Sequence, residues 1–234
     1  MEFHKYMIND QEKQDMSFIM YHEPNGIIAA IFASMPLKLK QHCIKVGTVA
    51  GIMSEYVPSS LIPKGMTHSD YSNAIRYGGF YHDIGAYLTY NDWLRYPSEG
   101  KKILEKEISV KKIANPIRTV ILETVGYYEE RYDGKGSPQK LCGRQIPFHS
   151  GVCAIANAMD NNVSFNRSFS DRIMIGIEKY IKLNEGIIFT PEAVAGFMAA
   201  RHKIRNMYYI WEENPPLWKR TDLNPVQKPY KKTT

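Results

Sequence analysis

The stretch HCIKVGTVAGIM, residues 42–53, repeats its apolar side chains with the spacing of a helix. Val46, Val49, Ala50 and Met53 stand at positions i, i+3, i+4 and i+7, so on an α-helix they share one apolar face. His42 stands at the beginning of the stretch. The pattern therefore predicts a core helix that carries a histidine near one end.

The same spacing recurs along most of the chain, and three further segments show it clearly: 117–128, 148–159 and 173–181. A fourth, FTPEAVAGFMAARHK at 189–203, has the features of a helix start, because Thr190 suits an N-cap and Pro191 suits the first helical turn. No stretch alternates convincingly as a β-strand does. The fold class we expect is all-α, a helical bundle.

The length of 234 residues and the 44% content of hydrophobic residues suit one domain with a substantial core. We expect the helical domain to occupy residues 28–205. A short segment, 1–27, precedes it, and a basic tail that contains prolines follows at 206–234.

The formal net charge of +6 is unevenly distributed. From Arg201 onward there are eight lysines and arginines against three acidic residues, whereas residues 1–200 carry a net charge of only +1. Positive charge that is concentrated near the end of the sequence favours a solvated tail over a folded surface that binds nucleic acid. Nucleic acid is therefore not an expected partner.

The three cysteines, Cys43, Cys142 and Cys153, are odd in number and form no CxxC pair. They predict buried apolar side chains, not a disulfide framework or a zinc–thiolate site. Charges interrupt the N-terminal segment, which excludes a signal peptide, and IIAAIFASM at 27–35 is too short to cross a bilayer. We expect a cytoplasmic protein with no membrane partner.

Residues able to bind a metal fall on four separate predicted helices or helix ends. They are His42, the pair His82–Asp83, the run Tyr128–Glu129–Glu130, and Asn157 with Asp160. Ligands that converge from the helices of a bundle are a common way to build a metal site. The alternative for a single histidine is a hydrogen-bonded core residue, so the combination carries more information than any one member.

Four motifs, in the same order along residues 28–200, resemble a known family. HCIKVGTVAGIM resembles the opening helix of the HD superfamily of metal-dependent phosphohydrolases, and FYHDIGA at 80–86 is similar to its name-giving dyad. YEERYDGKGSP at 128–138 resembles the signature of the HD-GYP subfamily, and IPFHSGVCAIANAMD at 146–160 resembles the segment after it. The resemblance implies an all-α bundle that hydrolyses cyclic di-GMP, using two or three iron or manganese ions to activate water.

Carried over residue by residue, the resemblance makes His42, His82 and Asp83 metal ligands, and it makes Asp83 the candidate catalytic residue. Glu129 stands where the signature has its second histidine and can still coordinate through a carboxylate. Asn157 stands where the family has a metal-binding aspartate and offers only a weaker, neutral oxygen. Asp160, three residues later, is retained.

The chain departs from the family pattern at other positions as well. Tyr96 and Tyr128 replace histidines, and a phenol is a poor ligand because it loses its proton only near pH ~10. Three further departures are Ala86 in place of a lysine, Ser137 in place of the tyrosine of GYP, and Lys38 one turn before His42. We therefore predict one divalent metal, such as iron or manganese, or none.

The loop YDGKGSP contains the candidate substrate-loop residues Asp133, Gly134 and Gly136. The resemblance implies that this loop contacts the substrate or a partner. Its composition equally suits a tight turn, with the glycines at positive φ and Asp133 as a turn cap.

Three functions remain open at this point. The first is a degenerate HD-GYP domain that hydrolyses cyclic di-GMP barely or not at all and binds a nucleotide or a signalling protein. The second is an active phosphohydrolase that uses one metal on a cyclic dinucleotide or another phosphoester. The third is an interaction module whose former site is collapsed and filled by Tyr96 and Tyr128.

Overall fold

The computed structural model describes residues 27–89, 92–107, 113–166 and 169–213. These parts of the chain are helical and contain no β-strand; only two isolated bridges occur in them, Asp133 with Cys142 and Glu185 with Phe189. The predicted all-α class is confirmed. The segment 1–26 and the residues after Glu213 lie outside the described residues.

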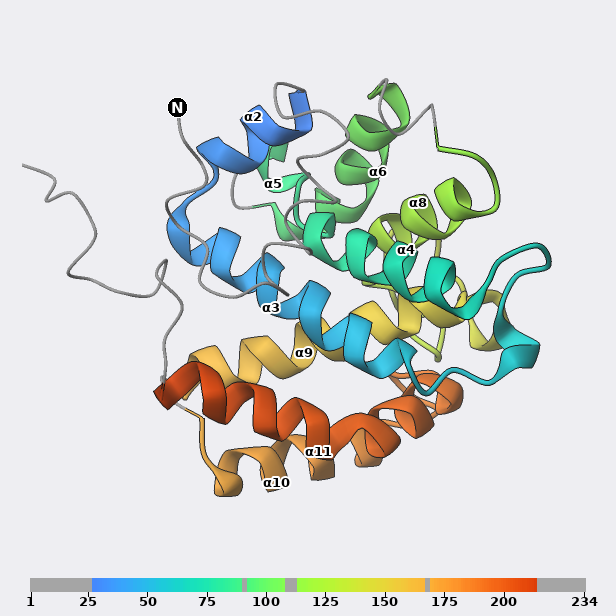
Figure 1. Ribbon diagram of the computed structural model, residues 1–234. Coiled ribbons are helices and arrows are strands. Elements are labelled where there is room, and N and C mark those ends of the chain that lie inside the picture. Colours follow the sequence, from blue (N-terminus) through green and yellow to red (C-terminus); the bar gives the residue numbers. More distant parts are fainter. Residues whose placement is uncertain (1–26, 90–91, 108–112, 167–168, 214–234) are drawn as a thin grey trace, which may run out of the picture.

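The helices form a bundle around two central members, α3 and α9 (Figure 1). In chain order the α-helices are α2 (Ile27–Ser34), α3 (Leu37–Ser54), α4 (His68–Tyr81), α5 (Ala86–Thr89), α6 (Tyr96–Lys106), α8 (Ile117–Tyr127), α9 (Phe148–Phe165), α10 (Asp171–Leu183) and α11 (Pro191–Glu213). Short 3-10 turns, η2 (Ser59–Leu61), η3 (Trp93–Arg95) and η4 (Gly143–Gln145), lie between them.

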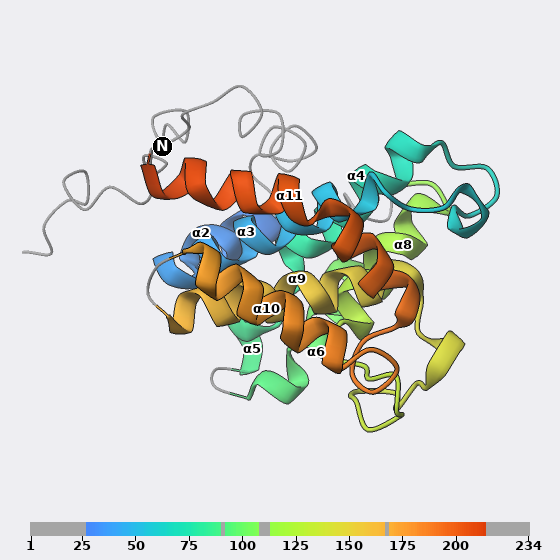
Figure 2. The same ribbon diagram turned by 90° about the horizontal axis from the view of Figure 1, so that it is seen from below.

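The other helices pack around α3 and α9. Helix α3 packs against α4, α9 and α11, and α8 packs against α4, α6 and α9 (Figures 1 and 2). The apolar face predicted for α3 is fully buried at Val46, Val49, Ala50 and Met53. The periodicity therefore identified the core side of this helix correctly.

Two glycines allow α3 and α4 to approach closely. A Cβ on Gly79 would lie 2.8 Å from the Cα of Gly47, which is closer than real contacts permit. A side chain at either position would therefore force the two helices apart. His42 lies on α3 and His82 directly follows the last residue of α4, each within a few residues of the contact, so the same approach brings the two histidines together.

Local capping explains where several helices begin. Thr67 and Asp70 form a capping box at the start of α4, and the Ser170 hydroxyl accepts a hydrogen bond from the Ile173 amide at the start of α10. The predicted start of α11 is confirmed: Pro191 is its first residue, and the Thr190 hydroxyl accepts from the Ala193 amide at 3.4 Å.

Helix α11 continues beyond residue 205, where the sequence placed the beginning of a tail, and ends at Glu213. Its last turns are held in the core by Tyr208 and Trp211, which are 1% and 6% exposed. Two cysteines, Cys43 and Cys153, are buried as predicted, but Cys142 is exposed and hydrogen-bonded to Gln145. Among the described helices none combines the length and hydropathy that a membrane span requires.

Candidate metal centre

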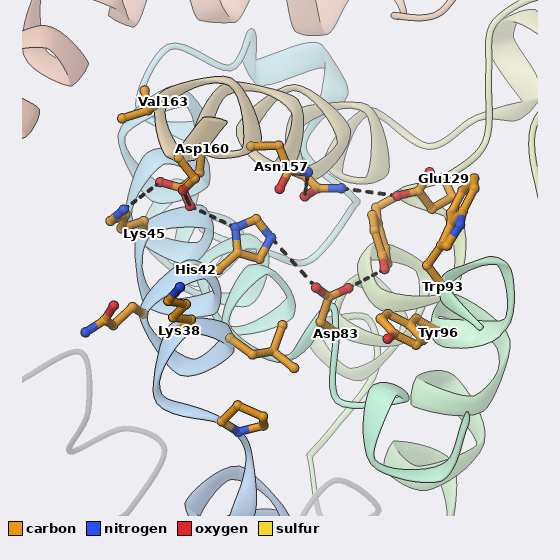
Figure 3. A pocket seen from close by; sticks show the side chains of 16 residues that line it. Lys38, His42, Lys45, Asp83, Trp93, Tyr96, Glu129, Asn157, Asp160 and Val163 are labelled. Carbon is orange, nitrogen blue, oxygen red and sulfur yellow. Dashed lines mark hydrogen bonds and ion pairs between the residues drawn. The ribbon is translucent and has the colours of Figure 1, made fainter. Parts of the chain in front are cut away.

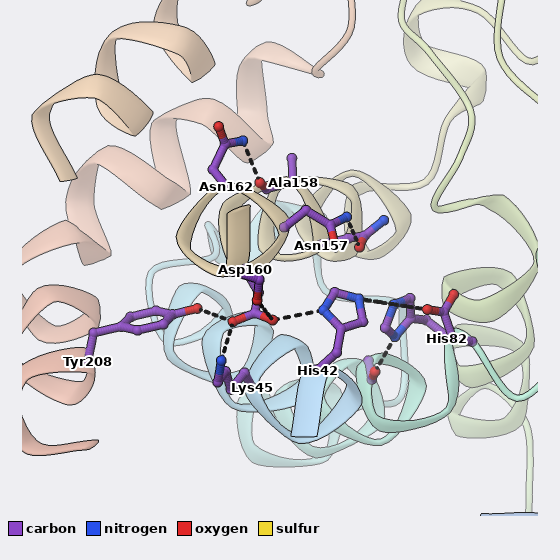
Figure 4. Close-up of polar contacts among 12 residues, drawn as sticks. His42, Lys45, His82, Asn157, Ala158, Asp160, Asn162 and Tyr208 are labelled. Atoms are coloured by element: carbon purple, nitrogen blue, oxygen red, sulfur yellow. Dashed lines mark hydrogen bonds and ion pairs between the residues drawn. The ribbon is translucent and has the colours of Figure 1, made fainter. Parts of the chain in front are cut away.

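Three candidate ligands from the sequence meet at the junction of α3 and α4. The Nε2 atoms of His42 and His82 are 3.2 Å apart, and Asp83 Oδ2 lies 3.7 Å from the first and 3.4 Å from the second. His42 projects from α3, whereas His82 and Asp83 occupy the turn directly after α4. These three residues form a group able to hold a metal ion (Figures 3 and 4).

Hydrogen bonds on the far side of each ring fix the histidine tautomers. His42 Nδ1 lies 2.8 Å from Asp160 Oδ2, and His82 Nδ1 lies 2.8 Å from the carbonyl oxygen of Gly79. A carboxylate oxygen and a carbonyl oxygen both accept, so each Nδ1 must carry the proton. In the neutral rings the two Nε2 lone pairs then face each other across 3.2 Å. The two lone pairs repel each other unless a proton or a cation lies between the rings.

The spacing of the three atoms fits one divalent ion. Neighbouring nitrogen and oxygen ligands at about 2.1 Å from a common ion lie roughly 3.0–3.4 Å apart for bond angles between octahedral and tetrahedral values. Two of the observed separations, 3.2 and 3.4 Å, lie within that range, and the third, 3.7 Å, is longer than its upper limit by about 0.3 Å. Imidazole and carboxylate are also the donor types that iron, manganese and zinc accept.

Burial and charge act on the two imidazoles in opposite directions. Burial lowers the pKa of His82, which has no exposed surface. Burial also opposes protonation of His42, but its hydrogen bond to Asp160 and the charges of Asp83 and Asp160 outweigh burial and raise the pKa of His42. Without a bound cation, His42 is therefore the ring that would carry the extra proton between the two Nε2 atoms.

Asp160 supports His42 from behind and does not face the other ligands. Its side chain is fully buried, and Oδ1 receives Lys45 Nζ at 3.1 Å and the Tyr208 hydroxyl at 3.0 Å (Figure 4). Oδ2 is the oxygen that bonds to His42. Carboxylates in this position orient a histidine and strengthen it as a ligand.

Tyr128, which stands where the resemblance expects a histidine, is bonded to Asp83. Its hydroxyl donates to Asp83 Oδ1 at 2.6 Å, which leaves Oδ2 as the oxygen that faces the histidines. The side chain is 3% exposed, and burial together with the charge of Asp83 raises the pKa of Tyr128 well above its usual value. The phenol therefore stays protonated and acts as a donor.

Glu129 and Asn157 lie along the same cleft but pair with each other. Asn157 Nδ2 donates to Glu129 Oε1 at 3.1 Å, and the Asn157 oxygen accepts from Asn161. Burial, and then the charge of Asp83, raises the pKa of Glu129 to about 7, although the bond from Asn157 opposes this shift. The structure thus brings together three of the five predicted ligands and places the other two beside them.

Two of the three candidate ligands, His42 and Asp83, line a cleft of about 790 Å³, whereas His82 is fully buried behind them. Figure 3 shows Lys38 and Lys45 on one side of His42 and Asp83, with Trp93, Tyr96 and Glu129 on the other. Tyr96 and Tyr128 line this space without filling it. The collapsed site expected for a purely structural module is therefore wrong.

The predicted substrate loop is held by its own contacts. Arg131 donates two hydrogen bonds to the Asp133 carboxylate, at 3.0 and 2.7 Å, and Asp133 also accepts from the Lys135 amide. Gly134 has a positive φ of 75°, as predicted. Gly136 does not belong to the positive-φ residues; it is required because a Cβ there would lie 2.5 Å from the Cα of Glu130.

Sequence reasoning missed three residues of this region. Lys45, Tyr208 and Trp93 were not recognised, although Lys45 lies one turn after His42 on the same helix and that spacing is a usable signal. Tyr208 comes from α11, far away in the chain, and no local pattern marks it.

Comparison with known proteins supports the resemblance found in the motifs. No protein-family model matches the chain. A cyclic di-GMP phosphodiesterase of Thermotoga maritima is 23% identical over 181 residues, which cover 74% of this chain and 47% of that protein. A crystal structure of a cyclic GMP-AMP specific phosphodiesterase of V. cholerae (V-cGAP3) matches 77% of this chain and 46% of the other, with 14% identity and a TM-score of 0.44. The chain spans about half the length of each.

Proposed function

We propose, on the premise that this chain is a distant relative of the HD-GYP cyclic di-GMP phosphodiesterases, that its cleft binds a cyclic dinucleotide or a related phosphoester. One divalent metal, such as iron or manganese, would be held by His42, His82 and Asp83. Hydrolysis would be slow or absent, and the protein would act as a nucleotide-responsive signalling module. The observation that carries this proposal is the convergence of the two Nε2 atoms and Asp83 Oδ2.

The surroundings of Asp83 support one metal in place of two. Tyr128 occupies Asp83 Oδ1, the oxygen that a second ion would need if the carboxylate were to bridge two ions. Asn157 is neutral and already bonded to Glu129. A second cation would therefore have to displace two hydrogen bonds and gain few anionic ligands.

A divalent metal in this position supplies Lewis-acid polarisation of a phosphoryl oxygen. The residues of the chain do the remaining work. Asp160 orients His42, and Tyr128 orients Asp83. Lys38 adds positive charge on the side of the cleft opposite Trp93, where Lys45 is paired with Asp160 (Figure 3). Asp83 is the candidate catalytic residue, because Oδ2 faces the metal position while Oδ1 is committed to Tyr128.

An active phosphohydrolase is the second candidate, and the open cleft favours it. Three protein ligands leave coordination positions for substrate and water, as in other catalytic metal sites. Under this alternative the same three residues would support turnover of a cyclic dinucleotide or another phosphoester. Measured turnover therefore separates the two candidates.

The test combines metal analysis, binding and turnover on the purified 234-residue chain. We expect close to one equivalent of metal after loading with Mn²⁺ or Fe²⁺, and metal-dependent binding of cyclic di-GMP by calorimetry. His42→Ala and Asp83→Asn should each lose the metal and weaken cyclic di-GMP binding at least about tenfold. His68→Ala, at an exposed histidine at the start of α4, is the matched control and should change neither quantity.

Two results would contradict the proposal. Wild-type protein that takes up no metal and binds no phosphoester would remove the function altogether. Two bound metals with rapid hydrolysis of cyclic di-GMP would replace the proposed binding role with that of a full enzyme.

A further inference from the structure

A second cleft of about 600 Å³ adjoins the first. The two are continuous, because both are lined by Trp93, Tyr128, Glu129, Asn157 and Asn161. We propose that this adjoining cleft binds a nucleobase of the ligand whose phosphate lies at the metal centre, and that Trp93 is its stacking surface. The inference rests on the proposed function and adds where the base of that ligand binds and which side chain covers it.

Trp93 stands at the boundary between the two clefts. It belongs to η3, it lines both spaces, and its side chain is 58% exposed (Figure 3). An indole offers a large flat apolar face, and covering it removes apolar area from water. A planar base can cover such a face while its sugar and phosphate extend toward His42 and Asp83.

The lining of the adjoining cleft suits a neutral, hydrogen-bonding ring. Tyr180 and Phe189 contribute further aromatic surface, and Asn161 and Asn162 contribute amides whose oxygens can accept from the amino group of a base. Side-chain amides and aromatic rings are the usual means of recognising unpaired bases. These groups would read the base edge while Trp93 covers its face.

The charges of the adjoining cleft argue against a phosphate there. Arg131 is already paired with Asp133, and Glu130 accepts from the Leu141 amide within the loop. Lys135 lines the cleft together with two acidic residues, Glu129 and Glu130. The lysines of the metal cleft, Lys38 and Lys45, do not line this second space. Base and phosphate are thus expected in different halves of one continuous groove.

The loop and the stacking surface are also linked. The Ser137 hydroxyl donates to the carbonyl oxygen of Leu94, next to Trp93, at 3.5 Å. Ser137 and Ala158 are small and line the second cleft, which leaves room for a ring. Ala158→Leu would reduce that room without changing any residue that lines the metal cleft.

The experiment follows the indole N–H signals of the 234-residue chain by NMR during titration with ligand fragments. Trp93→Phe assigns the signal, since its peak is lost. Guanosine 5′-monophosphate and guanosine should shift the Trp93 peak and leave the Trp211 peak unchanged. Ribose 5-phosphate, which has the phosphate without the base, should leave the Trp93 peak in place.

Binding of guanosine 5′-monophosphate to metal-loaded protein supplies the quantitative readout. Trp93→Ala should weaken it by roughly 5- to 150-fold, the range measured for loss of one base-stacking contact. Ala158→Leu should weaken it in the same direction. Both variants should keep the wild-type metal content and the wild-type affinity for ribose 5-phosphate. Phe165→Ala, which removes an aromatic side chain that is 87% exposed and lines neither cleft, is the control and should behave as wild type.

Failure of this inference can be told apart from failure of the proposed function. If ribose 5-phosphate and the nucleotide bind equally well and Trp93→Ala affects neither, the base subsite is wrong and the metal site stands. If guanosine still shifts the Trp93 peak while protein incubated with Mn²⁺ takes up no metal and does not bind ribose 5-phosphate, the base subsite stands and the proposed function is wrong. Absence of both effects overturns both.

Discussion

Asp83 divides its two carboxylate oxygens between different tasks. Oδ1 accepts a 2.6 Å hydrogen bond from Tyr128, and Oδ2 lies within 4 Å of both histidines. The tyrosine is a substitution relative to the family pattern, yet it gives the aspartate a fixed orientation. At the scale of one residue, Tyr128 supports a candidate ligand by fixing the orientation of its carboxylate.

Tyr128→Phe tests this role directly. It removes the hydroxyl and leaves a nearly buried carboxylate oxygen without its donor, so we expect a loss of about 1–3 kcal/mol in the free energy of unfolding. Loss of an outer partner of a metal ligand should also lower Mn²⁺ affinity by about 10- to 100-fold. Urea denaturation and calorimetric titration with Mn²⁺ measure the two effects.

Tyr127→Phe is the matched control for this change. Its hydroxyl accepts from Lys101 at a partly buried position outside both clefts, so stability should change by less than about 1 kcal/mol and metal affinity should not change. Equal metal affinity in Tyr128→Phe and wild type would show that the tyrosine does not position Asp83.

At the scale of single residues, the sequence predicted that the three candidate ligands lie together, but it did not predict all the hydrogen bonds around them. His42, His82 and Asp83 were identified from a family motif, and the structure places their ligand atoms within 4.8 Å of one another. The partner of Asp160 was not predictable in the same way. Tyr208 reaches it from α11, and such a contact depends on how helices pack and not on any local pattern.

Three helices meet at Asp160. Its carboxylate lies on α9, accepts from Lys45 and His42 of α3, and accepts from Tyr208 of α11 (Figure 4). The side chain is fully buried, so these bonds must offset the cost of removing its charge from water. They lower the pKa of Asp160, although burial, the largest single influence, acts in the opposite direction. One carboxylate thus links the candidate metal centre to α11.

Asp160→Ala should therefore destabilise the protein strongly. It leaves Lys45, whose side chain is only 12% exposed, without its counter-charge, and it leaves the Tyr208 hydroxyl without an acceptor. Breaking a buried charged group of this kind costs about 3–5 kcal/mol. Denaturation in guanidinium, monitored by circular dichroism, gives the value.

Asp171→Ala supplies the comparison for that measurement. Asp171 also bonds to α11, through Arg205 and Tyr209, but the Arg205 and Asp171 side chains are 41% and 52% exposed. Exposed ion pairs contribute at most about 1 kcal/mol. If Asp160→Ala and Asp171→Ala lower the free energy of unfolding equally, burial is not the reason why Asp160 stabilises the protein.

The elements themselves were predicted with uneven success, and the reasons are physical. The beginning of α11 was predicted because Thr190 and Pro191 act locally, through hydrogen-bonding capacity and a fixed φ. Its end was not, because the last turns are stabilised by burial of Tyr208 and Trp211 against other helices. Helix capping depends on neighbouring residues and can be predicted from the sequence, whereas burial against other helices depends on the tertiary fold.

The distribution of charge over the whole molecule also differs from the expected basic tail. Three of the eight basic residues after position 200 lie on α11. Lys203 pairs with Glu55 at the end of α3, Arg205 pairs with Asp171, and Arg201 donates to the carbonyl oxygen of Met198. Part of the charge assigned to a solvated tail therefore belongs to a helix that is part of the bundle.

Because α11 is part of the bundle up to Glu213, the folded domain should include all of it, and two truncated chains test this extent. We propose that the folded domain extends to the end of α11, so a chain ending after residue 213 should unfold within about 1 kcal/mol of the 234-residue chain. A chain ending after residue 205 lacks Tyr208 and Trp211. Each buried aromatic side chain contributes about 3–5 kcal/mol, which together approach the total stability of an ordinary domain.

The shorter chain should therefore be largely unfolded at 25 °C by circular dichroism, and it should lose metal binding as well, because the hydroxyl of Tyr208 helps to hold Asp160 behind His42. Adding Mn²⁺ in large excess provides a further check, since a ligand that binds only the folded state stabilises it by mass action. It should raise the melting temperature of the chain ending at 213 and leave the shorter chain unfolded. Equal melting temperatures for the two chains would place the boundary at residue 205, and α11 would then contribute nothing beyond that point.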